Sequence, residues 1–276
     1  MAPTLMTYTP LQSSAKPLRL AAMLVLAAAL LPASAQPAPR AGARPPEYTY
    51  QVVQVFPHDP AAFTQGLVYH GGFLYEGTGL NGRSSLRKVR LETGEVVQRV
   101  DLAPEFFGEG IALLKNQIVQ LTWQSQTGFV YSASDFHLLR RFSYTGEGWG
   151  LTTNGVDLFM SDGTADIRVL DGGTLREKRR LKVHDGSQAI TQINELEFVE
   201  GEILANVWQT DRIARISPQS GRVLGWIRPD WLAQPGLQAG AGRRAERDRV
   251  RCRQKTPVCY RQALAQRFRD SDCAQA

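Results

Sequence analysis

Cysteine is missing from most of this sequence. The chain has 276 residues and three cysteines, and Cys252, Cys259 and Cys273 all lie in the last 25 residues. A disulfide framework therefore does not hold the body of the chain together. With 43% hydrophobic residues, the chain has enough apolar side chains to build a buried core, in one large domain or two small ones.

Long apolar runs are scarce too. One run, over residues 20–31, follows two basic residues and precedes Ala33-Ser34-Ala35, the small-x-small pattern of a signal-peptidase site. This pattern predicts a signal peptide over residues 1–35, with cleavage before Gln36; an uncleaved anchor is the alternative. No second apolar run long enough to span a membrane follows. We therefore expect a mature protein that is periplasmic or secreted and is not attached to a membrane after signal cleavage.

Positive charge is concentrated at one end of the chain. Residues 240–276 carry ten Lys or Arg and four acidic residues, which accounts for the entire net charge of +6. The rest of the sequence is balanced, so no basic patch is expected on the fold and no nucleic acid is expected as a partner.

Helical periodicity is absent before this basic tail. A Pro- and Ala-rich linker at residues 36–47 is followed by short runs of β-branched and aromatic residues, broken by Gly, Asp, Asn and Ser. This pattern predicts an all-β domain over residues 48–232 and a separate tail over 233–276. The predicted strands include residues 48–56, 72–77, 85–91, 96–101, 117–122 and 128–131.

A polar turn between two strands recurs through this domain. Glu92, Asp135, Asp171 and Pro218 mark it, at steps of 43, 36 and 47 residues. Four-stranded blades of a β-propeller repeat at about 40 to 50 residues, so the repeat predicts four or five blades. A β-sandwich is the alternative fold, but it gives no reason for a repeated turn at this period.

Residues 106–110 contain a carboxylate in an unusual setting. Glu109 stands between two glycines and directly follows two aromatic residues, a setting that tends to raise the pKa of a carboxyl group. Gln65 and Trp149 lie about 40 residues before and after Glu109. Equivalent points of successive blades converge at the channel of a propeller, so we expect these side chains to meet there.

Several motifs together resemble a known family. They are residues 63–67 (FTQGL), 75–80 (YEGTGL), 82–87 (GRSSLR), 107–110 (FGEG), 121–123 (LTW), 147–152 (EGWGLT), 160–163 (MSDG), 194–197 (NELE) and 205–211 (ANVWQTD). In this order, from about residue 48 to residue 231, they resemble the plant and bacterial type of glutaminyl-peptide cyclotransferase.

The resemblance implies a five-bladed β-propeller that converts N-terminal glutamine to pyroglutamate and releases ammonia. It implies peptides or proteins with N-terminal glutamine as partners, and we expect a monomer. This family type is not built around a catalytic zinc. In agreement, the four histidines, at positions 58, 70, 137 and 184, contain no pair at metal-ligand spacing, and no metal or cofactor is predicted.

The resemblance also assigns roles to single residues. Glu109 matches the family's catalytic glutamate, which takes a proton from the attacking amine and gives one to the leaving ammonia. Phe107 is assigned as the apolar wall beside the glutamate. The cage around the substrate side chain is assigned to Trp123, Trp149, Trp208 and Phe63. Gln65 and Asn194 are expected to hydrogen-bond the substrate amide or carbonyl. Five other acidic residues are expected to be structural, paired with backbone groups or with Arg83 and Arg87: Glu76, Glu147, Asp162, Glu195 and Glu197.

The tail departs from the family pattern. After Trp231 the family continues with LNGIA and then FVTGKxWP, whereas residues 240–276 are Arg-rich and lack strand alternation. Back-translated with suitable codons and read one base later, residues 244–265 can spell both segments. We therefore hypothesise a frameshift that replaces the proper C-terminus, leaves the last blade incomplete and removes a lysine near the site, so that the activity of this chain is in doubt.

Two other functions fit a propeller. A non-catalytic propeller would bind peptides or partner proteins at the same channel. A metal-dependent propeller hydrolase would need several carboxylates and Asn side chains around an ion.

Overall fold

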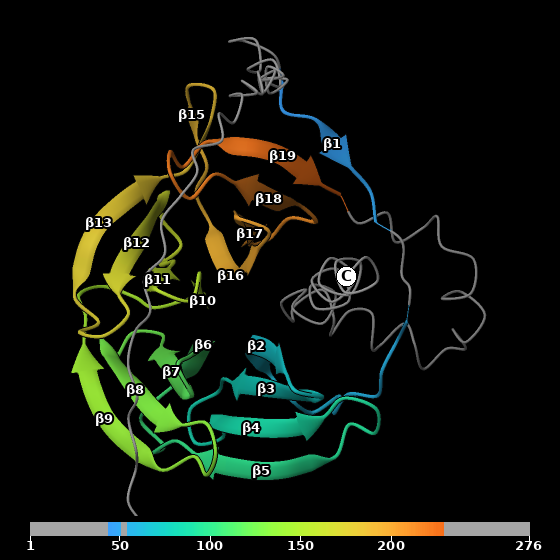
Figure 1. The fold of residues 1–276 in the computed structure, drawn as a ribbon, viewed down its shortest axis with the longest axis vertical. Coiled ribbons are helices and arrows are strands. Elements are labelled where there is room, and N and C mark those ends of the chain that lie inside the picture. The colour runs from blue at the N-terminus through green and yellow to red at the C-terminus, as the bar shows by residue number, and fades with distance from the viewer. Residues whose placement is uncertain (1–43, 51–53, 229–276) are drawn as a thin grey trace, which may run out of the picture. The chain divides into compact units, whose positions relative to one another are not determined.

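The computed structural model describes residues 44–50 and 54–228, and all its regular elements there are strands (Figure 1). No helix in this part of the chain is long and apolar enough to cross a membrane. The expected all-β class is confirmed. The predicted signal peptide and the basic tail, including the hypothetical frameshift, lie outside the described residues.

The strands form four blade-like antiparallel sheets and one short hairpin. The first sheet holds β2 (Thr64–His70), β3 (Phe73–Thr78), β4 (Ser85–Arg90) and β5 (Val96–Asp101). The second holds β6 (Gly108–Leu114), β7 (Gln117–Thr122), β8 (Thr127–Ser132) and β9 (Leu138–Ser143). The third holds β10 (Leu151–Thr153), β11 (Asp157–Met160), β12 (Asp166–Asp171) and β13 (Glu177–Lys182).

The fourth sheet has an extra strand from the start of the described chain. It holds β16 (Ile193–Val199), β17 (Glu202–Val207), β18 (Ile213–Ile216) and β19 (Val223–Ile227), preceded by the hairpin β14 (His184–Asp185) and β15 (Gln188–Ala189). β1 (Glu47–Tyr48) pairs in parallel with β19 at the outer edge. Arg215 stacks on the Tyr48 ring at 4.6 Å and supports this pairing.

Apolar side chains fill the spaces between successive sheets. One cluster joins Tyr75 and Leu86 to Ile111, a second joins Leu121 to Leu158, and a third extends from the third sheet to the fourth. Each fully buried side chain of this size contributes about 1.5–3 kcal/mol. The fourth strand of each of the first three sheets is mostly exposed; these strands are β5, β9 and β13. This is the face-to-face packing of propeller blades.

The first strands of the four sheets, β2, β6, β10 and β16, lie side by side in succession (Figure 1). Glycine makes this approach possible. A Cβ on Gly66 would lie 2.5 Å from the Ile111 nitrogen, and one on Gly110 would lie 2.5 Å from the Trp149 carbonyl oxygen. A Cβ on Gly150 would meet the Asn194 carbonyl oxygen. Backbone therefore packs on backbone where the blades converge.

The repeated turn is confirmed as a structural repeat. Glu92, Asp135, Asp171 and Pro218 lie at or next to the turn from the third to the fourth strand of their sheets. Four blades are therefore present in the described residues. The strand expected over residues 48–56 is wrong in its extent, because β1 ends at Tyr48 and residues 54–56 are not in a strand.

Candidate functional site

Three predicted site residues lie at β-bulges. The register between the first two strands shifts between Thr64 and Gly66, between Gly108 and Ile111, and between Ile193 and Leu196. Gln65, Glu109 and Asn194 are therefore at the same point of three inner strands, each as the second residue. A bulge places an extra residue on one strand and re-aims its side chain, which is common next to binding sites.

Glu109 is a buried carboxyl group, with 6% of the residue exposed. Burial raises its pKa well above the ordinary glutamate value, the negative charge of Glu147 raises it further, and a hydrogen bond from Gln65 opposes both effects. In that hydrogen bond, Gln65 Nε2 donates to Glu109 Oε1 at 3.0 Å. The buried Glu109 carboxyl group therefore keeps its proton to a higher pH than an ordinary glutamate does.

Three predicted aromatic residues form one continuous group. Phe107 packs edge-to-face on Phe63, with ring centroids 6.1 Å apart, and on Trp123, at 5.6 Å. The Phe107 ring also covers Gly79, next to the side chain of Gln65. The main chains of Phe107 and Trp123 are joined directly, because Trp123 N donates to the Phe107 carbonyl at 2.9 Å.

The other two predicted tryptophans form a second pair. Trp149 and Trp208 meet edge-to-face, with centroids 5.6 Å apart, and the Trp149 ring packs over Gly163. Gly110 N donates to the Trp149 carbonyl at 2.8 Å, so the residue after Glu109 is bonded directly to this tryptophan. Trp123 and Trp208 are 37% and 45% exposed, which leaves large aromatic surfaces open to a ligand.

Glu147 connects the two aromatic groups. Its Oε2 atom accepts from Trp123 Nε1 at 2.7 Å and from Trp149 Nε1 at 2.8 Å, and its Oε1 atom accepts from Gln124 at 3.0 Å. Burial opposes ionisation, but these hydrogen bonds lower the pKa of Glu147. The expectation that Glu147 pairs with backbone, Arg83 or Arg87 is wrong. In the sequence, only its position two residues before Trp149 could have indicated that Glu147 contacts the aromatic residues.

The remaining acidic residues do not share one partner. Glu76 accepts hydrogen bonds from Thr64 at 2.5 Å and from His58 at 2.8 Å, and Arg87 lies 3.9 Å from it. Asp162 pairs with Arg168 at 2.6 Å, with both side chains 6% exposed. Glu195 is buried on β16.

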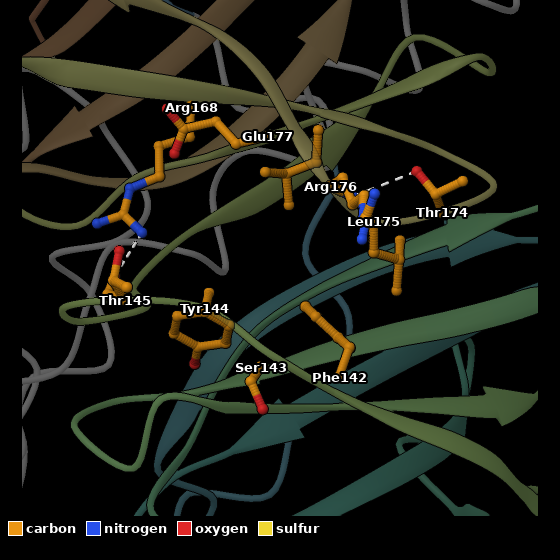
Figure 2. A pocket seen from close by; sticks show the side chains of 10 residues that line it. Phe142, Ser143, Tyr144, Thr145, Arg168, Thr174, Leu175, Arg176 and Glu177 are labelled. Atoms are coloured by element: carbon orange, nitrogen blue, oxygen red, sulfur yellow. Dashed lines mark hydrogen bonds between the residues drawn. The ribbon is translucent and has the colours of Figure 1, made fainter.

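No group of three or more His, Cys, Asp or Glu residues in the described part of the chain could hold a metal ion. A cavity of about 420 Å³ lies between the second and third sheets, lined by Tyr144, Arg168 and Glu177 among others (Figure 2). It contains none of the predicted site residues. We therefore place the candidate site at Glu109 and its aromatic neighbours.

Comparison with known proteins shows which family the chain is similar to. A sequence model of the family described as glutamine cyclotransferase matches residues 23–244. The chain is 43% identical over 192 residues to the glutaminyl-peptide cyclotransferase of Arabidopsis thaliana, which covers 69% of this chain and 60% of that protein. The chain thus spans about 60% of the length of that curated relative.

A solved structure adds a match in three dimensions. The crystal structure of Myxococcus xanthus glutaminyl cyclase superposes with a TM-score of 0.64 and 32% identity, over 68% of this chain and 80% of that one. The fold, an all-β propeller arrangement of four described blades, and the family match over most of the sequence lead to one assignment. The chain belongs to the glutamine cyclotransferase family.

Proposed function

We propose that this protein cyclises N-terminal glutamine of peptides or proteins to pyroglutamate, with release of ammonia. One observation carries the proposal: in a member of this family, the predicted glutamate is buried, has a raised pKa and is hydrogen-bonded at the point where inner strands converge. A carboxylate at the surface would be neither buried nor raised in its pKa by desolvation.

The reaction moves protons as well as closing a ring. The substrate α-amine attacks the γ-carbonyl carbon of its own glutamine side chain, the new C–N bond forms, and the γ-amide nitrogen leaves as ammonia. Glu109 takes a proton from the attacking amine and gives one to the leaving nitrogen, so its own protonation state is restored. A carboxyl group with a raised pKa is suited to both transfers.

Ring closure also requires a folded substrate. Trp123, Trp149 and Trp208, with Phe63 and Phe107, enclose the glutamine side chain and hold its carbonyl near the amine. Such positioning supplies a large part of the rate enhancement of an intramolecular reaction. Gln65 and Asn194 hydrogen-bond the substrate amide or carbonyl.

Ammonia release from a glutamine-initiated peptide tests the proposal. The wild type should release ammonia, and Glu109→Gln should reduce kcat by at least about 100-fold, the usual size of a general acid–base contribution. Glu202→Gln is the control, because Glu202 on β17 also accepts side-chain hydrogen bonds, in this case two from Arg215 at 2.8 Å. Peptide binding without any ammonia release would favour the non-catalytic alternative.

The proposal includes a fifth blade, which the family resemblance implies. The match leaves 20% of the Myxococcus xanthus protein uncovered, which is consistent with a further segment beyond the four described blades. The hypothetical frameshift would leave that blade incomplete. Resequencing the gene around codons 232–276 tests this: if the in-frame codons cannot be read as LNGIA and FVTGK one base later, the frameshift is rejected.

Export and a monomeric state are also part of the proposal. Export rests on the signal-peptide pattern at residues 1–35. The monomer is the expectation stated with the family resemblance. N-terminal sequencing of the protein recovered from a secreting host tests the cleavage before Gln36, and sedimentation of the mature protein tests the monomer.

A further inference from the structure

Glu147 has an unusual set of hydrogen bonds. One of its carboxylate oxygens accepts from two indole nitrogens, and the tryptophans that donate them come from different connections of the fold. Trp123 lies between β7 and β8, whereas Trp149 lies between β9 and β10. Glu147 is half-buried, and both donors to this oxygen are indole N–H groups.

The backbone alone does not set the direction of these two rings. Hydrogen bonds attach the main chain of Trp123 to Phe107 and that of Trp149 to Gly110, on the two sides of Glu109. They fix where each side chain starts, but the indole can still rotate about χ1 and χ2. Rotation is easiest for a ring in contact with solvent, and Trp123 is 37% exposed.

The carboxylate of Glu147 removes this freedom. Charge-assisted hydrogen bonds are about twice as strong as neutral ones, and two of them end on the same atom. Gln124 Nε2 donates to the other oxygen at 3.0 Å and holds the carboxylate itself in place. A binding site whose side chains are held before the ligand arrives avoids the cost of ordering them during binding.

We propose that Glu147 is a positioning residue that holds the indoles of Trp123 and Trp149 in the orientation that receives the substrate glutamine side chain. This inference rests on the proposed function. It assigns a role in the site to a residue that neither transfers a proton nor belongs to the aromatic cage.

A spectroscopic measurement tests the contact without any turnover. Indole N–H resonances are recorded by ¹⁵N NMR for the wild type and for Glu147→Ala, and are assigned with single Trp→Phe variants. The resonances of Trp123 and Trp149 should both shift. Trp226 is the internal control, because its Nε1 donates to Asp185 at 3.0 Å, and its resonance should not move. Unchanged resonances of Trp123 and Trp149 would overturn the proposal.

Kinetics test the functional part with a glutamine-initiated tripeptide amide. The charge of Glu147 also raises the pKa of Glu109, so all variants are compared on the pH plateau of kcat/KM, above the acidic limb. There Glu147→Ala should lower kcat/KM by about tenfold, mainly through KM, because uniform binding is lost. Glu147→Gln keeps an acceptor oxygen and should restore part of this loss. Glu202→Gln should match the wild type.

A double-mutant cycle separates positioning from a general loss of structure. In a Trp123→Phe, Trp149→Phe background no indole donates to Glu147. On the same pH plateau, Glu147→Ala should therefore change kcat/KM by less than about twofold. An equal effect in both backgrounds would overturn the proposal, as would wild-type kinetics for Glu147→Ala. If the wild type neither binds nor cyclises the tripeptide, the proposed function fails, and the positioning role fails with it. The two failures can be distinguished. If the wild type is active and Glu147→Ala has the same kinetics, the positioning role alone fails and the proposed function stands.

Discussion

Gln65 donates a hydrogen bond of 3.0 Å to Glu109, which lies 44 residues later in the chain. Both residues are at β-bulges of neighbouring inner strands, β2 and β6. The bond joins two blades at the buried carboxyl group, and it is the one interaction that lowers the pKa of Glu109 against burial and the charge of Glu147.

This relationship predicts the effect of Gln65→Leu on the pH profile. Loss of the hydrogen bond removes a stabilisation of the ionised form, so the pKa of Glu109 should rise further. The proposed base is active when ionised, so the acidic limb of kcat/KM should move to higher pH. Gln98→Leu on β5 serves as the control. A limb that stays in place, or that moves to lower pH, would contradict the assignment of Glu109 as the base.

Glu109→Gln should change stability in a pH-dependent way. A carboxyl group with a raised pKa in the folded protein destabilises that state increasingly as the pH rises from the unfolded pKa towards the folded one. The glutamine side chain does not ionise, so the variant does not lose folding stability in this way as the pH rises. Its Tm should therefore approach that of the wild type near pH 4 and exceed it by a growing margin at higher pH, as measured by calorimetry. A margin that is constant with pH would show that Glu109 titrates normally.

His58 should stabilise the fold more at acidic than at alkaline pH. A hydrogen bond to Glu76 raises the pKa of His58, while burial opposes the shift. The stabilisation is fully present below the unfolded pKa and is lost as the pH rises through the folded pKa. The difference in unfolding free energy between the wild type and His58→Gln should therefore decrease between pH 5.5 and pH 8.5 in urea titrations. The exposed His70, changed to Gln, is the control.

Gly110→Ala should be severely destabilising. The added Cβ would lie 2.5 Å from the Trp149 carbonyl oxygen, and a contact with backbone cannot be relieved by rotating a side chain. We expect a loss of about 3 kcal/mol or more in unfolding free energy. Gly173→Ala is the matched control, because its nearest atom is a side-chain oxygen of Asp171 at 3.5 Å, and it should be nearly neutral. Equal stability of the two variants would contradict the close approach of β6 and β10.

Asp162→Asn tests the buried ion pair with Arg168. Both side chains are 6% exposed, so removal of one charge leaves the other buried without compensation. The expected cost is about 3–5 kcal/mol in unfolding free energy. Asp166→Asn removes a carboxylate that lies 3.9 Å from Arg180 at the surface and should cost less than about 1 kcal/mol. Similar costs for the two variants would mean that Arg168 is better solvated than its exposure indicates.

The sequence predicted much of the fold from spacing alone. The turns marked by Glu92, Asp135, Asp171 and Pro218 recur because each blade repeats the same four-strand unit, and repetition leaves a periodic signal. The strand at Gln117–Thr122 was predicted with its observed bounds. The strand expected over residues 48–56 failed because apolar alternation does not reveal whether a neighbouring edge is available for pairing.

Glu147 shows what spacing could not predict. Acidic residues near arginines suggest ion pairs, and nothing local distinguishes a carboxylate that accepts from tryptophans 24 and 2 residues away. Those contacts exist only once two connections are brought together.

Residue types and their order, by themselves, determined the all-β class, the repeated blade and the candidate residues at equivalent points of the inner strands. Their chemistry was decided by the tertiary structure. Glycines at 66, 110 and 150 let backbones meet, bulges turn Gln65 and Glu109 towards each other, and neighbouring blades exclude water from the carboxyl group. A raised pKa is a property of that enclosure, because desolvation depends on every chain segment around the group and not on its sequence neighbours.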